Sequence, residues 1–470
     1  MKAWSKEKIT PFALVLLITS AIDSVRNLPG IALFGSKLIF FFIFSAILFL
    51  IPVSLIAAEL AAAWSEEEGG VYSWVKQAFG TNMAFLAIWL QWINTMVWYP
   101  TILSFIAGTF AYLIEPTLAQ NKFYLISVIL IVFWSLTFIG LSGIHTSANF
   151  VSFCTIFGLM LPMGFLIALA LIWIAGHHPI AIDLSWDKLI PNWSDSQSWV
   201  SLTAIMTSFL GMELAAVHVR NVRHPQKNFP RALFFSALLI LFTMILGSLS
   251  IAMVLPKNQI SLVGGVIQAF TNFLDAYHWK HLMPVVTVLL LIGSVGGMIN
   301  WIISPAKGLL LAADHGFLPH WLYRLNRHGV ASRVLIMQAV LVTLLCSAYF
   351  LLPSINGIYW LFTALSTELY MVMYVLMFIA AVCLKRKFPN RVRPFKVAGG
   401  NKGYYLACFL GLIGALITLV IGFIPPTDII NFGWTARYQS LFSCGILFMI
   451  LPSGLFYFHK YRVHKKENIP

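Results

Sequence analysis

The sequence predicts an all-α integral membrane protein with twelve transmembrane helices. Of its 470 residues, 60% are hydrophobic and only 10% are charged, whereas a typical soluble chain has about 25% charged residues. The mean hydropathy is +0.86. Apolar runs recur along nearly the whole chain, each long enough to cross a bilayer as a helix. We therefore expect one transmembrane domain over residues 1–470.

Twelve segments meet this criterion. They cover residues 10–35, 38–63, 82–115, 122–141, 146–175, 198–219, 231–255, 282–312, 334–352, 357–384, 404–424 and 438–459. The third and the eighth are long enough to be tilted or to carry short flanking helices. The loops between the segments are short, so the sequence predicts no inserted soluble domain.

The distribution of basic residues predicts that both termini are cytoplasmic. With the N-terminus inside, 22 of the 30 Lys and Arg residues fall in cytoplasmic segments, 6 in external loops and 2 within spans. Cytoplasmic loops carry the excess of Lys and Arg in membrane proteins. The net charge of +14 is therefore explained by loops that face a lipid bilayer, and no nucleic-acid partner is expected.

The first apolar segment is interrupted in its middle by charged residues. Its stretch from Ser20 to Gly30 contains Asp23, Arg26 and Asn27, followed by Pro29. An ionised group at bilayer depth costs roughly 2.5–3.5 kcal/mol, and a broken helix is tolerated there only when it lines a cavity or is buried in protein. From this stretch alone, half of a substrate site and a kinked, buried helix with an internal Asp–Arg pair are equally good interpretations.

The sixth segment repeats this pattern. Gly211 and the ionisable Glu213 lie in mid-span, and interrupted segments at corresponding places in two halves indicate a transporter site. The separation of five helices predicts a five-plus-five inverted repeat over residues 10–175 and 198–384, followed by two further helices in residues 404–459. The alternative is a glycine that allows close helix packing beside a hydrogen-bonded glutamate.

Such a pair of breaks suits a zwitterion. A half-helix N-terminus attracts a carboxylate, and freed carbonyl groups attract an ammonium group. An α-amino acid presents both groups. The five cysteines lie in apolar segments without metal-ligand or redox spacing, and no catalytic motif is present. We therefore expect no metal, no cofactor and no enzymatic activity.

Further ionisable groups lie in or near the spans. Tyr370 and Tyr374 share one face of a helix, whereas Glu368 lies about 200° from Tyr370, so the three do not form one cluster. Glu368 is a candidate for proton coupling. Lys307 is a gating candidate, although snorkelling to the interface is the better interpretation. Glu59 and the acids of residues 66–68 are expected to form a solvated loop.

Several stretches resemble the amino acid–polyamine–organocation superfamily, and most closely its bacterial glutamate/GABA antiporter branch. They are residues 66–80, 250–256 (SIAMVLP), 265–270 (GVIQAF) and 301–308 (WIISPAKG), with Gly211-Met-Glu213, His218-Val219 and residues 221–230. The resemblance covers nearly the whole chain. It implies the inverted-repeat fold with helices one and six discontinuous, alternating access, and exchange of an amino acid for a related amine. It also implies the inner membrane of a bacterium.

The chain also departs from that branch. Gly297 stands where the branch has a glutamate linked to substrate handling, and the long C-terminal plug segment is missing. Asp23 and Arg26 make helix one more highly charged than in the branch. The tyrosine pair of helix ten matches at Tyr370 and Tyr374. The resemblance therefore carries over the fold and the substrate class, but not glutamate or GABA.

The sequence thus predicts a secondary active transporter of amino acids or amines, with exchange as the first hypothesis. A proton-coupled symporter, with Glu213 or Glu368 as the proton-binding group, is the alternative. A non-transporting receptor on the same fold is the third. The predicted substrate-binding residues lie in the two breaks and on helix ten: Ser20, Ala21, Asp23, Ser24, Arg26, Asn27, Ser208, Gly211, Met212, Glu213, Tyr370 and Tyr374. A monomer and a homodimer both remain open.

Overall fold

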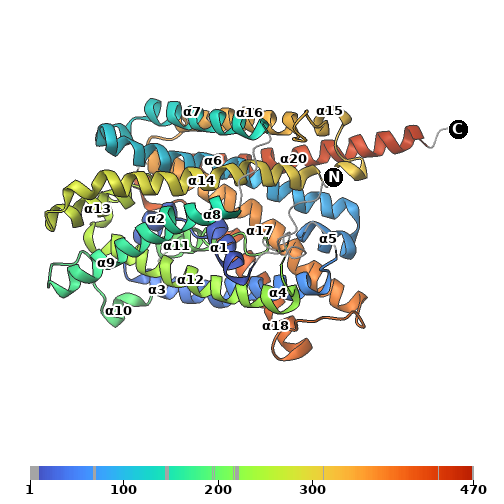
Figure 1. Ribbon diagram of the computed structural model, residues 1–470, viewed down its shortest axis with the longest axis horizontal. Coiled ribbons are helices and arrows are strands. Elements are labelled where there is room, and N and C mark those ends of the chain that lie inside the picture. Colours follow the sequence, from blue (N-terminus) through green and yellow to red (C-terminus); the bar gives the residue numbers. More distant parts are fainter. Residues whose placement is uncertain are drawn as a thin grey trace.

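The computed structural model describes residues 10–66, 70–142, 148–192, 194, 196–214, 216, 222–310, 312–431 and 433–467. This part of the chain is a bundle of long helices with short connections (Figure 1). The predicted all-α class is confirmed.

The first half contains eleven α-helices up to the second break. They are α1 (Pro11–Ile22), α2 (Leu28–Ala32), α3 (Lys37–Ser45), α4 (Ile51–Ala63), α5 (Val71–Phe79), α6 (Thr81–Ile114), α7 (Lys122–Leu141), α8 (Ala148–Thr155), α9 (Leu161–Ala175), α10 (Trp186–Leu189) and α11 (Ser196–Thr207). The rest of the described chain forms α12 (Pro225–Val254), α13 (Gly265–Ala276), α14 (Met283–Leu310), α15 (His320–Tyr323), α16 (Ser332–Cys346), α17 (Ile355–Lys387), α18 (Gly400–Ile421), α19 (Thr427–Asn431) and α20 (Thr435–Glu467).

Eleven helices among the described residues are long and apolar enough to cross a membrane. They correspond to every predicted span except the sixth, residues 198–219. There the chain forms only the 12-residue α11 before the helix is interrupted, so the count of twelve is not confirmed. The short α11 agrees with the predicted discontinuity of this segment.

Two of the spanning helices widen just before a proline. Residues Ala46–Leu50 and Ile156–Met160 are π-helical turns that join α3 to α4 and α8 to α9. Pro52 and Pro162 follow at the second position of the next helix. Proline has no N–H group, and its ring crowds the carbonyl group four residues earlier. A widened turn relieves that crowding without ending the span.

The two interrupted helices are enclosed by long, continuous ones. The break between α1 and α2 packs on α12, and α11 packs on α3, α17 and α18. Two of the three longest helices, α6 and α17, lie against one another through the middle of the bundle (Figure 1). This arrangement surrounds both breaks with protein, which is the condition for irregular backbone at membrane depth.

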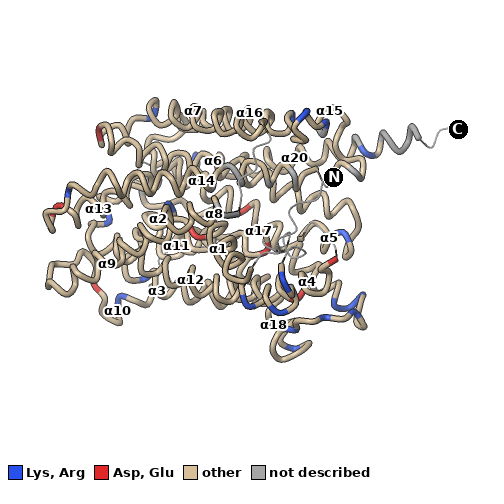
Figure 2. Tube along the Cα trace, in the orientation of Figure 1, with Lys and Arg blue, Asp and Glu red and all other residues tan. Residues whose placement is uncertain are grey.

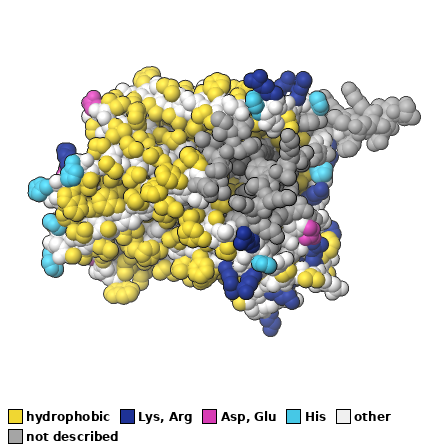
Figure 3. All heavy atoms as spheres, viewed as in Figure 1, with side chains coloured by type: hydrophobic (Ala, Val, Ile, Leu, Met, Phe, Trp, Pro, Cys, Tyr) yellow, Lys and Arg dark blue, Asp and Glu magenta, His cyan; other side chains and the backbone are white. Residues whose placement is uncertain are grey.

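Apolar and charged side chains are separated on the surface. Hydrophobic side chains cover most of the face in Figure 3, as expected of a surface that contacts lipid. Lys and Arg gather mainly at the end that contains α15 and the start of α18 (Figure 2). The structure therefore has one strongly basic end.

Candidate functional site

The first helix is interrupted at the position that the sequence predicts. α1 ends at Ile22, and Asp23 and Ser24 have extended backbones (φ/ψ −69°/131° and −151°/122°). A 3₁₀ turn from Val25 to Asn27 then leads into α2. The break therefore frees backbone groups inside the bundle, between two half-helices.

The sixth segment is interrupted beside it. After α11 the chain turns through residues 208–213, and Gly211 has a φ of +104°, a conformation that residues with a Cβ atom rarely adopt. A Cβ atom at Gly211 would lie 3.6 Å from Cγ1 of Ile22, the last residue of α1. The two breaks are thus in contact, although about 190 residues separate them in the sequence.

Glu213 is the centre of a buried hydrogen-bond cluster, which we call the inner cluster (Gln91, Gly211, Glu213, Tyr370 and Tyr374). The Tyr370 hydroxyl donates to Oε1 of Glu213 at 2.7 Å, and the Tyr374 hydroxyl donates to Oε2. Nε2 of Gln91 also donates to Oε1, at 3.3 Å. The Gly211 N–H donates to the Tyr374 hydroxyl at 2.9 Å. Three neutral donors therefore hold this carboxyl group.

Arg26 is the centre of a second group, the outer cluster (Arg26, Trp98, Thr101 and Tyr359). Nη1 of Arg26 donates to Thr101 at 2.9 Å and to Tyr359 at 3.3 Å. The guanidinium carbon lies 5.0 Å from the centre of the Trp98 ring. The Tyr359 hydroxyl donates to the Arg26 carbonyl at 3.1 Å. Within the described chain, Arg26 forms no ion pair and its Nε has no hydrogen-bond partner.

Asp23 points away from Arg26. The Thr243 hydroxyl on α12 donates to Oδ2 of Asp23 at 2.7 Å, whereas Arg26 contacts α6 and α17. Both side chains are 3% exposed. The alternative of an internal Asp–Arg pair is therefore not what the structure has.

A small cavity lies between the two broken segments and α17. It is lined by Asn27, Gly30, Ala204, Tyr359, Trp360 and Thr363. Asn27 is thus the predicted residue that faces open space. The cavity adjoins the outer cluster through Tyr359, so a ligand group placed there would meet the neighbourhood of Arg26.

The remaining predicted substrate-binding residues lie in or next to the two breaks. The hydroxyls of Ser20 and Ser208 donate to carbonyl groups three residues earlier, those of Leu17 and Ile205. Met212 is fully buried, whereas Ala21 and Ser24 are partly exposed. Lys307 lies in α14, but its side chain is outside the described part of the structure.

Glu368 lies on the other side of α17 from the inner cluster, as its helical angle predicts. It is 1% exposed. A side chain at Gly422, at the end of α18, would collide with its carboxyl group. Neither carboxyl oxygen has a hydrogen-bond partner in the described chain.

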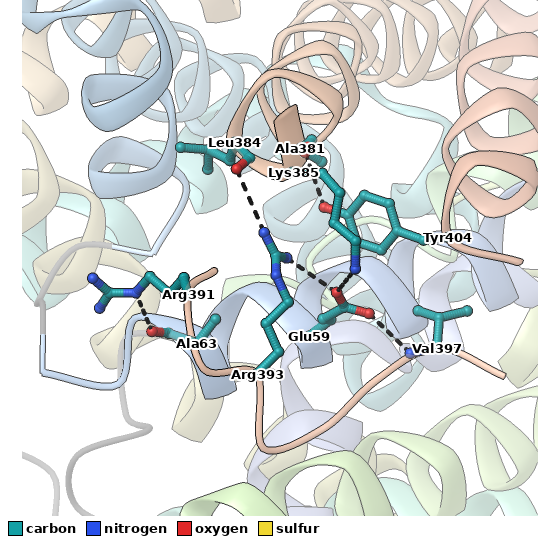
Figure 4. Close-up of polar contacts among 9 residues, drawn as sticks. All are labelled: Glu59, Ala63, Ala381, Leu384, Lys385, Arg391, Arg393, Val397 and Tyr404. Carbon is teal, nitrogen blue, oxygen red and sulfur yellow. Dashed lines mark hydrogen bonds and ion pairs between the residues drawn. The ribbon is translucent and has the colours of Figure 1, made fainter. Parts of the chain in front are cut away.

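The expectation for Glu59 is wrong. Glu59 is fully buried and binds Lys385 at 2.7 Å and Arg393 at 3.0 Å (Figure 4). Its Oε2 accepts the Val397 N–H at 2.9 Å. We call these four residues the Glu59 cluster. Glu66, whose side chain is 59% exposed, agrees with the expected solvated loop, and residues 67–69 lie outside the described chain.

Sequence reasoning missed four residues that complete the two clusters of the site. They are Gln91, Trp98 and Thr101 on α6, and Tyr359 on α17. One signal was available, because Tyr359 precedes Tyr370 by eleven residues, about three helical turns. No comparable spacing points to Gln91, Trp98 and Thr101, because isolated polar and aromatic side chains are common in a helix as long as α6.

The fold and the contact between the two breaks define a membrane transporter with discontinuous helices. Comparison with known proteins identifies the family. Residues 9–451 match the amino acid permease family, and the chain belongs to it. The resemblance to the amino acid–polyamine–organocation superfamily is thereby confirmed.

Three relatives illustrate the range of this family. An uncharacterized transporter of Legionella pneumophila is 39% identical over 455 residues, 95% of this chain and 96% of its own. A glutamate/gamma-aminobutyrate antiporter of Lactococcus lactis is 30% identical over 98% of this chain and 92% of its own. A probable agmatine/putrescine antiporter of the same species is 24% identical, over 89% of each chain. Two of these three relatives are thus named as antiporters, and the names give different substrates.

Proposed function

We propose that this protein exchanges an amino acid for a related amine or amino acid across the inner membrane of a bacterium, by alternating access. The observation that carries the proposal is the contact between the two breaks, at Ile22 and Gly211. In transporters with discontinuous helices, half-helix termini bind substrate at such a place. Exchange is supported by the similarity to antiporters.

The substrate site proposed here consists of backbone from both breaks, residues 20–27 and 208–213. The second half-helix of the first break begins with the 3₁₀ turn Val25–Asn27, and its N-terminal side would attract the substrate carboxylate, because the helix dipole favours an anion there. Carbonyl groups at the end of α1, where the helix stops at Ile22, would attract the ammonium group. Tyr370 and Tyr374 would form the wall on the side of α17.

The side chain of the substrate would be selected by the two clusters. Arg26 has no counter-charge in the described chain, and a buried charge without a partner is strongly unfavourable. An anionic group of the substrate near Arg26 would supply that counter-charge. The inner cluster, by contrast, contains an acid held by neutral donors, and a cationic group could compete for Glu213.

Counterflow in proteoliposomes tests exchange. Vesicles with purified protein are loaded with one unlabelled amino acid or its decarboxylation product, and labelled substrate is added outside. We expect uptake that depends on the internal substrate, with a preference that changes in Arg26→Gln and is retained in Lys280→Gln, a control at an exposed position. The absence of counterflow across a full panel of amino acids and amines would exclude exchange.

Proton-coupled symport is the second candidate, and Glu368 favours it. A buried carboxyl group without hydrogen-bond partners is costly to ionise, which suits a group that carries a proton. A pH gradient should then drive uptake into vesicles without internal substrate, and Glu368→Gln should abolish that uptake. Strict dependence on internal substrate excludes this mechanism. The receptor alternative gains no support from the relatives, which are transporters.

We further propose that both termini are cytoplasmic and that the basic end in Figure 2 faces the cytoplasm. The basis is the distribution of Lys and Arg, which accumulate on the cytoplasmic side. Fusion of a reporter that fluoresces only in the cytoplasm to the C-terminus should give a fluorescent protein. A periplasmic phosphatase fused at the same place should remain inactive.

A further inference from the structure

A cavity of about 690 Å³ lies at the basic end of the protein, away from the two breaks. Three segments line it: the end of α4 with the following residues, the start of α12, and the connection between α17 and α18. The lining residues are Ala62, Ala63, Ser65, Glu66, Gln226, Lys387, Phe388, Pro389, Asn390, Arg391, Val392 and Pro394. We call it the α4–α17 cavity.

The segments that form this cavity are rich in basic residues. Residues 385–402 contain seven Lys and Arg and no acid, and residues 222–231 contain three and no acid. Two of these cations, Lys387 and Arg391, and one acid, Glu66, line the cavity itself. The positive-inside rule explains why such segments are basic, but it does not explain a cavity between them.

The Glu59 cluster adds a buried excess of charge beside this cavity. Two cations, Lys385 and Arg393, share the one carboxylate of Glu59 (Figure 4), and their side chains are only 11% and 4% exposed. A buried charge without compensation is unfavourable. An anion in the cavity would lower that cost, because the connection that carries Arg393 also forms the cavity wall.

The two cations that line the cavity have donors to spare. Lys387 donates to the Gln77 carbonyl at 3.0 Å, which leaves two of its three N–H groups for other partners. Arg391 donates through Nε to the Ala63 carbonyl at 2.9 Å and also binds Glu66. Its guanidinium lies over the Trp64 ring, which fixes its plane. A phosphate oxygen entering between Lys387 and Arg391 would find oriented donors.

The position of the cavity favours a lipid over a soluble anion. It lies at the ends of α4 and α17, which belong to two helices long and apolar enough to cross a membrane, and basic segments at such ends meet anionic headgroups. Apolar side chains line it beside the two cations, among them Phe388, Pro389 and Val392, and Val392 is 79% exposed. Cations next to exposed apolar side chains match a phosphate group attached to a glycerol and acyl chains.

We propose that the α4–α17 cavity binds the phosphate headgroup of one anionic phospholipid. Lys387 and Arg391 hold the phosphate, and Phe388 and Val392 contact the glycerol and upper acyl chain. The bound lipid compensates the excess charge of the Glu59 cluster and steadies the connection between α17 and α18. This site is separate from the substrate site and does not depend on the proposed exchange.

Native mass spectrometry of the full-length protein in detergent tests the proposal. The protein is titrated separately with phosphatidylglycerol, phosphatidylcholine and inorganic phosphate. We expect one phosphatidylglycerol to bind with clear preference over phosphatidylcholine. Lys387→Gln and Arg391→Gln should each weaken it about fivefold, since a basic residue near a membrane surface contributes about that factor.

Lys396→Gln and Lys402→Gln are the matched controls. Lys396 lies in the same connection and Lys402 in the first turn of α18; both positions are exposed and outside the cavity, and both variants should leave phosphatidylglycerol binding unchanged. Arg391→Lys keeps the charge and should retain most of the binding. This result would show that the loss in Arg391→Gln is caused by the missing charge and not by misfolding. If all four Gln variants lost phosphatidylglycerol binding to the same extent, the lipid would be attracted by the overall positive charge of this end, and the proposal of a specific site would be overturned. Equal binding of phosphatidylcholine, or of free phosphate as tightly as lipid, would overturn it as well.

Discussion

Glu59 and Glu213 are both buried glutamates, but their partners are of opposite kinds. Glu59 is held by two cations and a backbone N–H group from the far end of the chain. Glu213 is held by two tyrosine hydroxyls and an amide, all neutral. The carboxylate of Glu59 is thus held by ion pairs. The carboxyl group of Glu213 is held by neutral hydrogen-bond donors, which a cationic substrate could displace and which allow it to bind a proton.

This difference in partners indicates different roles for the two glutamates. A carboxylate between two buried cations cannot lose its charge without leaving them unpaired, which is strongly unfavourable. A carboxyl group between hydroxyls can gain a proton or a cationic ligand, because each hydroxyl can either donate or accept. We therefore infer that Glu59 stabilises the fold and that Glu213 takes part in the transport cycle.

Substitution of Glu59 tests the first half of this comparison and has the largest expected effect. Glu59→Gln leaves Lys385 and Arg393 without a counter-charge. Removal of one partner from a buried ion pair costs about 3–5 kcal/mol. We expect a large fall in melting temperature and poor recovery of monodisperse protein, measured by thermal unfolding and size-exclusion chromatography in detergent.

Glu66→Gln is the control for that variant. Glu66 also pairs with an arginine, Arg391, but its side chain is 59% exposed, and exposed pairs contribute about 0–1 kcal/mol. The melting temperature of Glu66→Gln should therefore be nearly that of the unmodified protein. If both variants had the same melting temperature, Glu59 would not stabilise the fold as its contacts indicate.

Substitution of Glu213 tests the second half of the comparison. Glu213→Gln replaces one acceptor oxygen by an NH₂ group, so the hydrogen bond from Tyr374 or the pair from Tyr370 and Gln91 must be lost or reversed. Hydrogen bonds to a charged group contribute about 1.5–3 kcal/mol, or about 10- to 150-fold in a rate. We expect exchange in proteoliposomes to fall by that factor.

The melting temperature separates this result from unfolding. Glu213→Gln should melt well above Glu59→Gln, because the hydrogen-bond partners of Glu213 in the described chain are neutral. Wild-type exchange in Glu213→Gln would show that the inner cluster is only a packing element. A melting temperature as low as that of Glu59→Gln would remove the distinction between the two glutamates.

The sequence predicts the breaks but not the partners of the charges beside them. Proline, glycine and ionisable residues in an apolar run are local signals, so the interruptions at Asp23 and Gly211 can be read directly. The helical angle also places Glu368 away from Tyr370. These features depend on residues that are neighbours in the chain.

The contacts of Arg26 and Glu59 depend on residues far away in the chain. Arg26 meets Thr101 and Tyr359, 75 and 333 positions away, and Glu59 meets Lys385, 326 positions away. Nothing in the local sequence distinguishes a carboxylate that meets such cations from one in a solvated loop. For that reason the expectation for Glu59 fails.

Removal of the two α17 tyrosines that bind Glu213 should reduce exchange by different amounts. Tyr374→Phe removes the donor to Oε2 of Glu213 and also the acceptor of the Gly211 N–H group. Tyr370→Phe removes one donor to Oε1 and one acceptor of Gln91, but Gln91 still donates to Oε1, so neither group is left without a partner. Because only the first variant leaves two buried groups unpaired, at about 1 kcal/mol each, exchange should fall about 30-fold in the first variant and only about fivefold in the second. The reverse order would show that Tyr374 does not couple the second break to α17.

Glu368 is a third buried glutamate, and its substitution should have the smallest effect. Its carboxyl group has no hydrogen-bond partner in the described chain, so Glu368→Gln removes no interaction and conserves shape. If the protein works by exchange, we expect a much smaller loss of stability than in Glu59→Gln, because no ion pair is broken, and counterflow close to that of the wild type.

Gly422 provides the steric counterpart of that measurement. A side chain there collides with the carboxyl group of Glu368, so Gly422→Ala should lower the melting temperature. Glu368→Ala in the same chain should restore much of that loss, because the collision disappears. Additive losses in the double variant would contradict the packing of α17 on α18. Loss of counterflow in Glu368→Gln would instead make this glutamate, rather than Glu213, the one that the transport cycle uses.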